Sequence, residues 1–186
     1  MLNEQERQAL LQAASASVYR GLDRGQPLPV EPEEYPEKLA KPGACFVTLT
    51  ISGRLRGCVG SLEAWRPLIQ DCAENAFAAA FRDFRFPPVA AQELDLLDYQ
   101  VSVLSVPAPL YSESEDDLLS QLRPGTDGLV LVKGDRRATF LPSVWESLPE
   151  PQEFLRHLKQ KAGLAPEGWS GAIKALRYTV ESIRRM

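Results

Sequence analysis

The sequence has few of the residues that crosslink a chain or bind metals. It contains 3 cysteines, an odd number with no CxxC pair, and 1 histidine among 186 residues. A disulfide framework and a cysteine-rich zinc site are therefore poorly supported, and we expect no metal and no cofactor. Free thiols are typical of a reducing compartment, so we expect a cytoplasmic protein.

Long apolar runs and concentrated positive charge are also missing. No segment approaches the ~20 apolar residues of a membrane-spanning helix, and the first residues are polar and acidic, unlike a signal peptide. The net charge is -4 and the basic residues are scattered. We therefore expect no membrane and no nucleic acid as partners. The one tight cationic pair, Arg184 and Arg185, is interpreted as a solvated C-terminal tail.

The composition is that of a globular protein, with 44% hydrophobic and 25% charged residues. Strand and helix patterns alternate irregularly, and several strands are joined by short turns such as Ser52-Gly53. This arrangement favours an α+β fold with antiparallel sheets flanked by helices over a doubly wound fold. We expect helices within 4–20, 68–80, 115–122 and 154–162, and strands within 44–51, 54–60, 99–106, 129–132, 137–141 and 172–183.

The N-terminal segment carries clear helix signals followed by many prolines. Asn3 and Glu6 have the spacing of a capping box, and Gly21 is a plausible stop for the first helix. Five prolines follow between residues 22 and 43, so we expect no regular structure there.

Residues 54–60 form the main candidate site. Side chains of a strand alternate between its faces, so Arg54, Arg56 and Cys58 would share one face, with Leu55 and Val59 directed to the core. Guanidinium groups beside a thiol stabilise the thiolate, the reactive form of cysteine. From the spacing alone, the alternative that Cys58 is a small buried hydrophobe is favoured.

Gly57 lacks a side chain, so a ligand or another backbone could approach it closely. In the segment 82–88, Arg85 could hold a carboxylate or phosphate, and Asp83 could pair with an arginine. Helix-dipole contacts of the arginines explain this segment equally well. A metal site that combines Cys58 with Asp83 or Asp127 is the least supported alternative, and the single His157 is expected at a helix boundary rather than in a dyad with Cys58.

Turn chemistry and core packing explain two further segments. Gly125-Thr126-Asp127-Gly128 suits a tight turn, and Thr139-Phe140-Leu141-Pro142 ends a strand. A role for Asp127 as acid, base or cation ligand has no support from spacing.

Together these segments resemble the AMMECR domain family, known in bacteria as AmmeMemoRadiSam system protein A. The resemblance is carried by 55–61 (Leu-Arg-Gly-Cys-Val-Gly-Ser), 82–88, 125–129, 139–142 and 161–164, in register over residues from about 39 to 180. Two positions depart from the family pattern: Phe84 replaces a usual proline and Val59 a usual isoleucine.

The resemblance implies two unequal subdomains with a cleft between them, the larger from about 1–50 plus 120–186 and the smaller from about 51–119. It also implies that the family's characteristic residues gather in that cleft. The site candidates are then Arg56, Gly57, Cys58, Asp83, Arg85, Phe86, Asp127, Thr139 and Pro142.

The resemblance raises an enzymatic role for Cys58 above the packing alternative. We expect a protein that acts on a small anionic or peptide-like substrate. Cys58 would be the nucleophile or redox-active thiol, Arg56 would stabilise its thiolate, and Arg85 would orient the substrate. Asp83 or Asp127 would transfer protons, while Gly57, Phe86, Thr139 and Pro142 would line the site. The alternative is a non-catalytic module that binds a ligand or docks to a radical SAM protein or a Memo-like protein, the partners that the bacterial family name implies.

Overall fold

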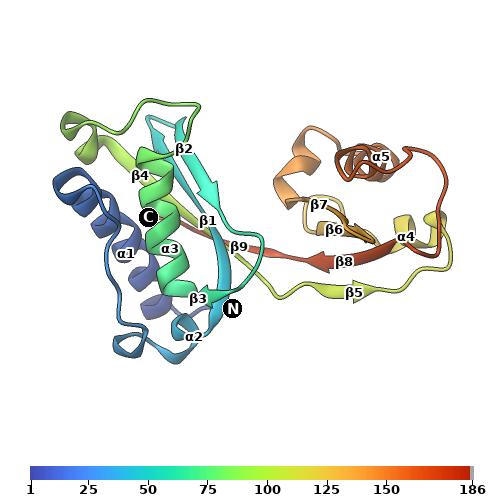
Figure 1. Ribbon diagram of the computed structural model, residues 1–186, viewed down its shortest axis with the longest axis horizontal. Helices are drawn as coiled ribbons and strands as arrows, with labels where there is room; N and C mark the ends of the chain where they lie inside the picture. Colours follow the sequence, from blue (N-terminus) through green and yellow to red (C-terminus); the bar gives the residue numbers. More distant parts are fainter. Residues whose placement is uncertain (185–186) are drawn as a thin grey trace. The chain divides into compact units, whose positions relative to one another are not determined.

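The computed structural model describes residues 1–184 and divides into two compact units (Figure 1). Unit 1 comprises Met1–Leu104 together with the C-terminal segment from Glu181, and unit 2 comprises Ser105–Val180. Both units combine an antiparallel sheet with helices, which confirms the predicted α+β class.

The sheet of unit 1 has the strand order β2-β1-β4-β9, with a short β3 beside the start of β1. These strands are β1 (Pro42–Ile51), β2 (Arg54–Gly60), β3 (Arg66–Pro67), β4 (Leu97–Leu104) and β9 (Val180–Arg184). Helices α1 (Glu4–Arg24) and α3 (Leu68–Phe81) cover one face of this sheet (Figure 1). A 3-10 helix, η2 (Ala91–Leu96), precedes β4.

The first helix begins as predicted but ends later. Asn3 and Glu6 form the capping box, each side chain accepting a hydrogen bond from the other residue's backbone N–H. Gly21 does not end the helix but lies inside it, where its missing side chain leaves room for α3. A Cβ at this position would lie 2.3 Å from the ring of Phe81. The helix ends instead at Gly25, which has φ 66°, the left-handed conformation that favours glycine.

The proline-rich connection contains more regular structure than expected. It includes a 3-10 helix η1 (Pro32–Glu34) and a short helix α2 (Glu37–Ala40). The buried Ser17 hydroxyl holds its start against the helices, since it accepts a hydrogen bond from the Leu28 N–H and donates one to the carbonyl oxygen of Ala73. Apolar side chains from the helices and from the inner face of the sheet form the core of unit 1, including Leu10, Val18, Val47, Leu49, Ile69 and Val101, all 0% exposed.

Unit 2 contains a sheet of order β5-β8-β6-β7. Its elements are β5 (Ala108–Leu110), α4 (Glu115–Gln121), β6 (Gly128–Lys133), β7 (Arg136–Phe140), η3 (Pro142–Glu146), α5 (Pro151–Lys161) and β8 (Lys174–Tyr178). The rings of Trp145 and Phe154 stack with centroids 3.8 Å apart at the centre of its core. The strand predicted within 172–183 is two strands, β8 in unit 2 and β9 in unit 1.

The boundaries of the units differ from those implied by the resemblance. Strand β1 pairs with β2 and, over eight residue pairs, with β4. The backbone hydrogen bonds of one sheet therefore tie residues 51–104 to β1. The chain divides near 104/105 and 180/181 rather than at 50/51 and 119/120.

Candidate functional site

Strand β2 carries a β-bulge that changes the predicted alternation of its side chains. Leu49 of β1 pairs with Gly57, and the next residue, Thr50, pairs with Leu55, so Arg56 is an extra residue without a partner. One inserted residue shifts the preceding side chains to the other face. Leu55, predicted to enter the core, is therefore 45% exposed, whereas Val59, beyond the bulge, packs against the core as predicted.

Gly57 lies where β2 crosses the C-terminal half of α3. A Cβ at this position would lie 2.1 Å from the carbonyl oxygen of Ala79. The close approach that the glycine permits is thus made by the backbone of α3, which fixes β2 against the helix.

Cys58 is half-buried and lies on the face of the sheet that α1 and α3 do not cover. Its cross-strand partner on β1 is Thr48, which stands between the fully buried Val47 and Leu49 and so faces away from the helices. The Thr48 hydroxyl donates a hydrogen bond to the Cys58 sulfur over 3.3 Å. The thiol is accordingly in a polar setting and not sealed among aliphatic side chains.

Asp83 and Arg85 hold the backbone of Cys58 at the edge of the sheet. The Cys58 N–H donates to Oδ2 of Asp83 over 2.9 Å, and its carbonyl oxygen accepts from Nη2 of Arg85 over 3.1 Å. Because β2 is an edge strand, these backbone groups have no neighbouring strand, and the two side chains satisfy them instead. This pair therefore fixes the position from which the sulfur projects.

Arg85 also binds Asp83 in a two-pronged ion pair, with Nε–Oδ1 2.9 Å and Nη2–Oδ2 2.6 Å. The Arg85 guanidinium, helped by the Cys58 N–H, holds the pKa of Asp83 well below its usual range. Asp83 stays ionised, so the geometry favours a positioning role for it over proton transfer.

The guanidinium beside the thiol belongs to Arg85 rather than to Arg56. The pKa of Arg85 is raised chiefly by Asp83 and to a lesser degree by the nearby Cys58 thiol. Arg56 instead forms a two-pronged ion pair with Glu93, with Nε–Oε1 2.7 Å and Nη2–Oε2 2.9 Å. Arg56 and the Ala90 N–H lower the pKa of Glu93 to about 2. Arg56 thus fastens the segment before β4 to β2.

Phe86 completes the loop beside the thiol. The guanidinium carbon of Arg85 lies 5.6 Å from the centre of the Phe86 ring, and the Phe86 N–H donates to the carbonyl oxygen of Asp83. Phe84, which replaces the usual proline, is 97% exposed between the two charged residues.

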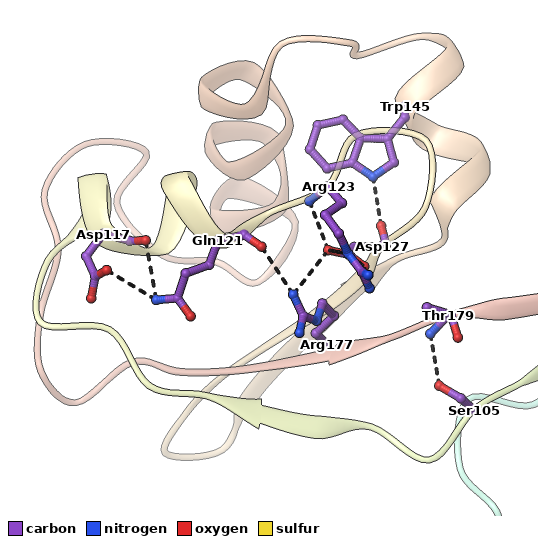
Figure 2. A network of polar contacts seen from close by, with 8 residues as sticks. All are labelled: Ser105, Asp117, Gln121, Arg123, Asp127, Trp145, Arg177 and Thr179. Carbon is purple, nitrogen blue, oxygen red and sulfur yellow. Dashed lines mark hydrogen bonds and ion pairs between the residues drawn. The ribbon is translucent and has the colours of Figure 1, made fainter.

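Asp127 lies in unit 2, where it closes a turn (Figure 2). Its buried carboxylate accepts from the N–H of Arg123 over 2.9 Å and from Nη2 of the same residue over 2.7 Å. The Asp127 carbonyl oxygen accepts from the indole of Trp145, and the Arg177 guanidinium lies 3.6 Å from the carboxylate. All these partners belong to unit 2.

The remaining candidates also lie in unit 2. The Thr139 hydroxyl donates to the carbonyl oxygen of Leu129 and lies 2.9 Å from the hydroxyl of Tyr178, so it is used within the sheet. Pro142 opens η3. Nδ1 of His157 contacts the carbonyl oxygen of Glu153 within α5. The structure therefore brings Arg56, Gly57, Cys58, Asp83, Arg85 and Phe86 together in unit 1 and places Asp127, Thr139 and Pro142 in unit 2.

A buried polar network in unit 1 was missed by the sequence reasoning. The Asp71 carboxylate, 0% exposed, accepts from the Ser61 hydroxyl (2.6 Å), Nε of Arg66 (2.8 Å), the Asn75 amide (2.9 Å) and the N–H of Cys45 (2.9 Å). It ties the end of β2 to β1, β3 and α3. The only sequence signal was that Asp71 and Asn75, four residues apart, interrupt the apolar stripe of α3.

The other two cysteines are fully buried. The adjacent Cys72 thiol and burial raise the pKa of the Cys45 thiol well above its usual range. Cys45 is thus held in its protonated, unreactive form.

Within residues 1–184, no three His, Cys, Asp or Glu side chains are grouped so that they could hold a metal ion. Over the same residues, no helix has the length and apolar character needed to cross a bilayer.

Comparison with known proteins places the chain in one family. The AMMECR1 family model matches residues 11–183. A protein of Thermotoga maritima is 42% identical over 156 residues, covering 82% of this chain and 84% of its own length, and one of Methanothermobacter thermautotrophicus is 39% identical over 171 residues, covering 89% and 86%. The crystal structure of an uncharacterised protein from Pyrococcus horikoshii superposes with a TM-score of 0.81 at 30% identity, over 98% of this chain and 92% of that one. The chain therefore belongs to the AMMECR1 family.

Proposed function

We propose that the protein is an enzyme whose reactive group is the Cys58 thiol in unit 1. The observation that carries this proposal is the setting of Cys58: its sulfur accepts a hydrogen bond from Thr48, and the Arg85 guanidinium donates to the carbonyl oxygen of the same residue. Cys58 is also the one cysteine of the three that is not buried. A polar, partly exposed thiol near a positive charge is the setting of reactive cysteines.

Two hydrogen-bond donors lie near the Cys58 sulfur. The Thr48 hydroxyl and the Arg85 guanidinium both place hydrogen-bond donors near the sulfur, where negative charge develops. Among the described residues no carboxylate or imidazole is hydrogen-bonded to the sulfur, so the thiol proton leaves to solvent. The sulfur lone pair would then form a bond to an electrophilic carbon, and the group that leaves would take the electrons of the broken bond.

The charge balance beside the sulfur favours a peptide-like substrate. Arg85 is paired with Asp83 and Arg56 with Glu93, so each guanidinium is neutralised by a carboxylate. The neighbourhood of the sulfur thus offers hydrogen-bond donors without net positive charge. Uncharged amide groups suit it better than a strongly anionic group does.

Alkylation by iodoacetamide across the pH range, followed by mass spectrometry of the Cys58 peptide, tests the proposal. We expect Cys58 to react faster than glutathione near neutral pH, and Thr48→Val, which keeps the shape but removes the donor, to slow it several-fold. Thr50→Val is the matched control, since Thr50 lies on the same strand but has Leu55 rather than Cys58 as its partner on β2. If Cys58 reacts no faster than glutathione, Cys58 is not the reactive group.

A second candidate function, docking to a partner protein, is favoured by one observation. Phe84 is 97% exposed between Asp83 and Arg85, which hold Cys58. An aromatic side chain in this position could anchor a radical SAM protein or a Memo-like protein. Calorimetry with each purified protein from the same organism tests this role: docking predicts binding that Phe84→Ser weakens at least tenfold and Cys58→Ser leaves unchanged. The absence of binding to both proteins removes this candidate.

A further inference from the structure

A row of polar side chains crosses the sheet of unit 1 on the face opposite α1 and α3, beginning at Cys58. Thr48 of β1 is the cross-strand partner of Cys58 on β2 and of Gln100 on β4. The Gln100 amide nitrogen lies 3.2 Å from the Ser102 hydroxyl and 3.5 Å from that of Ser182 on β9. The row therefore passes over all four long strands in their order in the sheet.

Arg184 lies at the far end of this row. It is exposed to solvent, as expected from the sequence, but it does not lie in a tail, because it belongs to β9 and its Nε donates to Oε1 of Gln100 over 2.7 Å. Its predicted companion, Arg185, lies outside the described residues. The Arg184 side chain is exposed and makes no ion pair with a described residue, Asp98 on the same face included. Its terminal nitrogens remain available to a ligand.

The Arg184 guanidinium differs in its partner from those of the two arginines near Cys58. Arg56 and Arg85 each bind a carboxylate of the protein, whereas the partner of Arg184 within residues 1–184 is the neutral amide of Gln100. Of the arginines on or beside this row, Arg184 is the one able to offer a two-pronged contact to an incoming carboxylate.

We propose that this row, Cys58–Thr48–Gln100–Arg184, is the substrate track of the Cys58 site and that it binds an extended peptide-like chain by its free carboxylate. The inference depends on the enzymatic role proposed for Cys58 and names its substrate class. The carboxylate pairs with Arg184, and an amide of the chain contacts Gln100. Phe46, which lies beside the row on β1 between Gly60 and Ser102, offers an apolar surface to a side chain of the substrate.

The spacing of the strands sets the length of the chain. Neighbouring strands lie ~4.8 Å apart, so the three steps from β2 to β9 span about 14 Å. An extended chain covers about 3.3 to 3.6 Å per residue. About four residues therefore separate the reacting carbon from the carboxylate.

Three alkylating probes test the track: iodoacetyl-triglycine, its C-terminal amide, and iodoacetamide. In the first two, the acyl unit and three glycines supply the required length. We expect the acid to label Cys58 at least threefold faster than the amide at low salt, because only the acid can pair with Arg184. Arg184→Gln should bring the two rates together and leave the iodoacetamide rate unchanged. Arg24→Gln, an exposed charge change at the end of α1, should preserve the difference.

The outcomes separate the track from the reactivity of the thiol. Equal rates for the acid and the amide in the unaltered protein, or a difference that survives Arg184→Gln, overturn the track. Slow labelling by iodoacetamide, relative to glutathione, overturns the enzymatic role itself. Because the acid-to-amide ratio and the iodoacetamide rate are measured separately, each result identifies which of the two proposals is wrong.

Discussion

Asp83 in unit 1 and Asp127 in unit 2 show how one chemical motif serves two structural roles. Each buried carboxylate accepts a backbone N–H and a two-pronged contact from an arginine close in sequence. Asp127 accepts its backbone hydrogen bond from the N–H of Arg123, which belongs to the same turn. Asp83 accepts a hydrogen bond from the N–H of Arg85 in its own loop and, in addition, one from the N–H of Cys58, 25 residues earlier in the chain.

The difference lies in what each carboxylate holds. Asp127 closes a local turn, and its network contains no nucleophile (Figure 2). Asp83 joins the loop after α3 to an edge strand and so determines where a thiol projects. A carboxylate–arginine pair becomes part of a candidate site when its third partner lies on the element that carries the reactive group.

Alanine substitutions of glycines in the two units should have the largest effect on the free energy of unfolding. Gly57→Ala should lower the free energy of unfolding by at least about 3 kcal/mol, because the added Cβ meets the backbone of α3 at Ala79. Gly128→Ala in unit 2 should cost less, since its Cβ meets the ring of Tyr178, a side chain that can move. Urea unfolding measures both, with Gly171→Ala, which meets no atom within 4 Å, as the control. Equal losses for Gly57 and Gly128 would contradict the explanation.

Amide substitutions of the two aspartates should differ in kind. Asp127→Asn should lower the free energy of unfolding by about 2 to 3 kcal/mol, because it replaces a fully buried hydrogen-bond acceptor. It should leave the alkylation rate of Cys58 unchanged, because the partners of Asp127 belong to unit 2 and Cys58 belongs to unit 1. Asp83→Asn should lower the free energy of unfolding by about 1 to 2 kcal/mol. It should also change the alkylation rate of Cys58, since it weakens the hydrogen bond that holds the Cys58 N–H at the edge of the sheet. Identical alkylation rates in both variants would mean that Asp83 has no positioning role.

The pair between Arg56 and Glu93 should give a smaller, pH-dependent effect. The pKa of Glu93 falls from its ordinary 4.5 to about 2 in the folded protein, so its contribution to stability is complete above pH 4.5 and is lost as the pH falls towards about 2. Glu93→Gln should thus cost about 1 to 2 kcal/mol at pH 7, and the difference from the unaltered protein should shrink below pH 4.5. Thermal unfolding at a series of pH values measures it; a constant difference down to pH 2 would show that the ion pair contributes nothing.

Local signals in the sequence predicted much of the fold. The capping box at Asn3, the apolar stripe of α3 and the hairpin turn at Ser52-Gly53 each depend on neighbouring residues, and the structure contains all three. The end of α1 was mispredicted because Gly21 serves contact with Phe81, a partner 60 residues away that no local pattern reveals.

The candidate site was predicted in part. The segments around Cys58 and Asp83 meet in unit 1, but the role of each arginine depended on partners distant in sequence. Arg56 pairs with Glu93, and the bulge at Arg56 exposes Leu55. A bulge is defined by the register of two strands, so an alternating pattern read along one strand does not contain it.

The most direct test of the reactive thiol compares Cys58 with itself. The rate of its alkylation by iodoacetamide at pH 7 is measured in the folded protein and in the urea-unfolded protein, where flanking residues are the same but Thr48 and Arg85 are removed from the sulfur. Our account predicts faster alkylation in the folded state, although folding half-buries the residue. A rate in the folded state equal to or below that of the unfolded chain would contradict it.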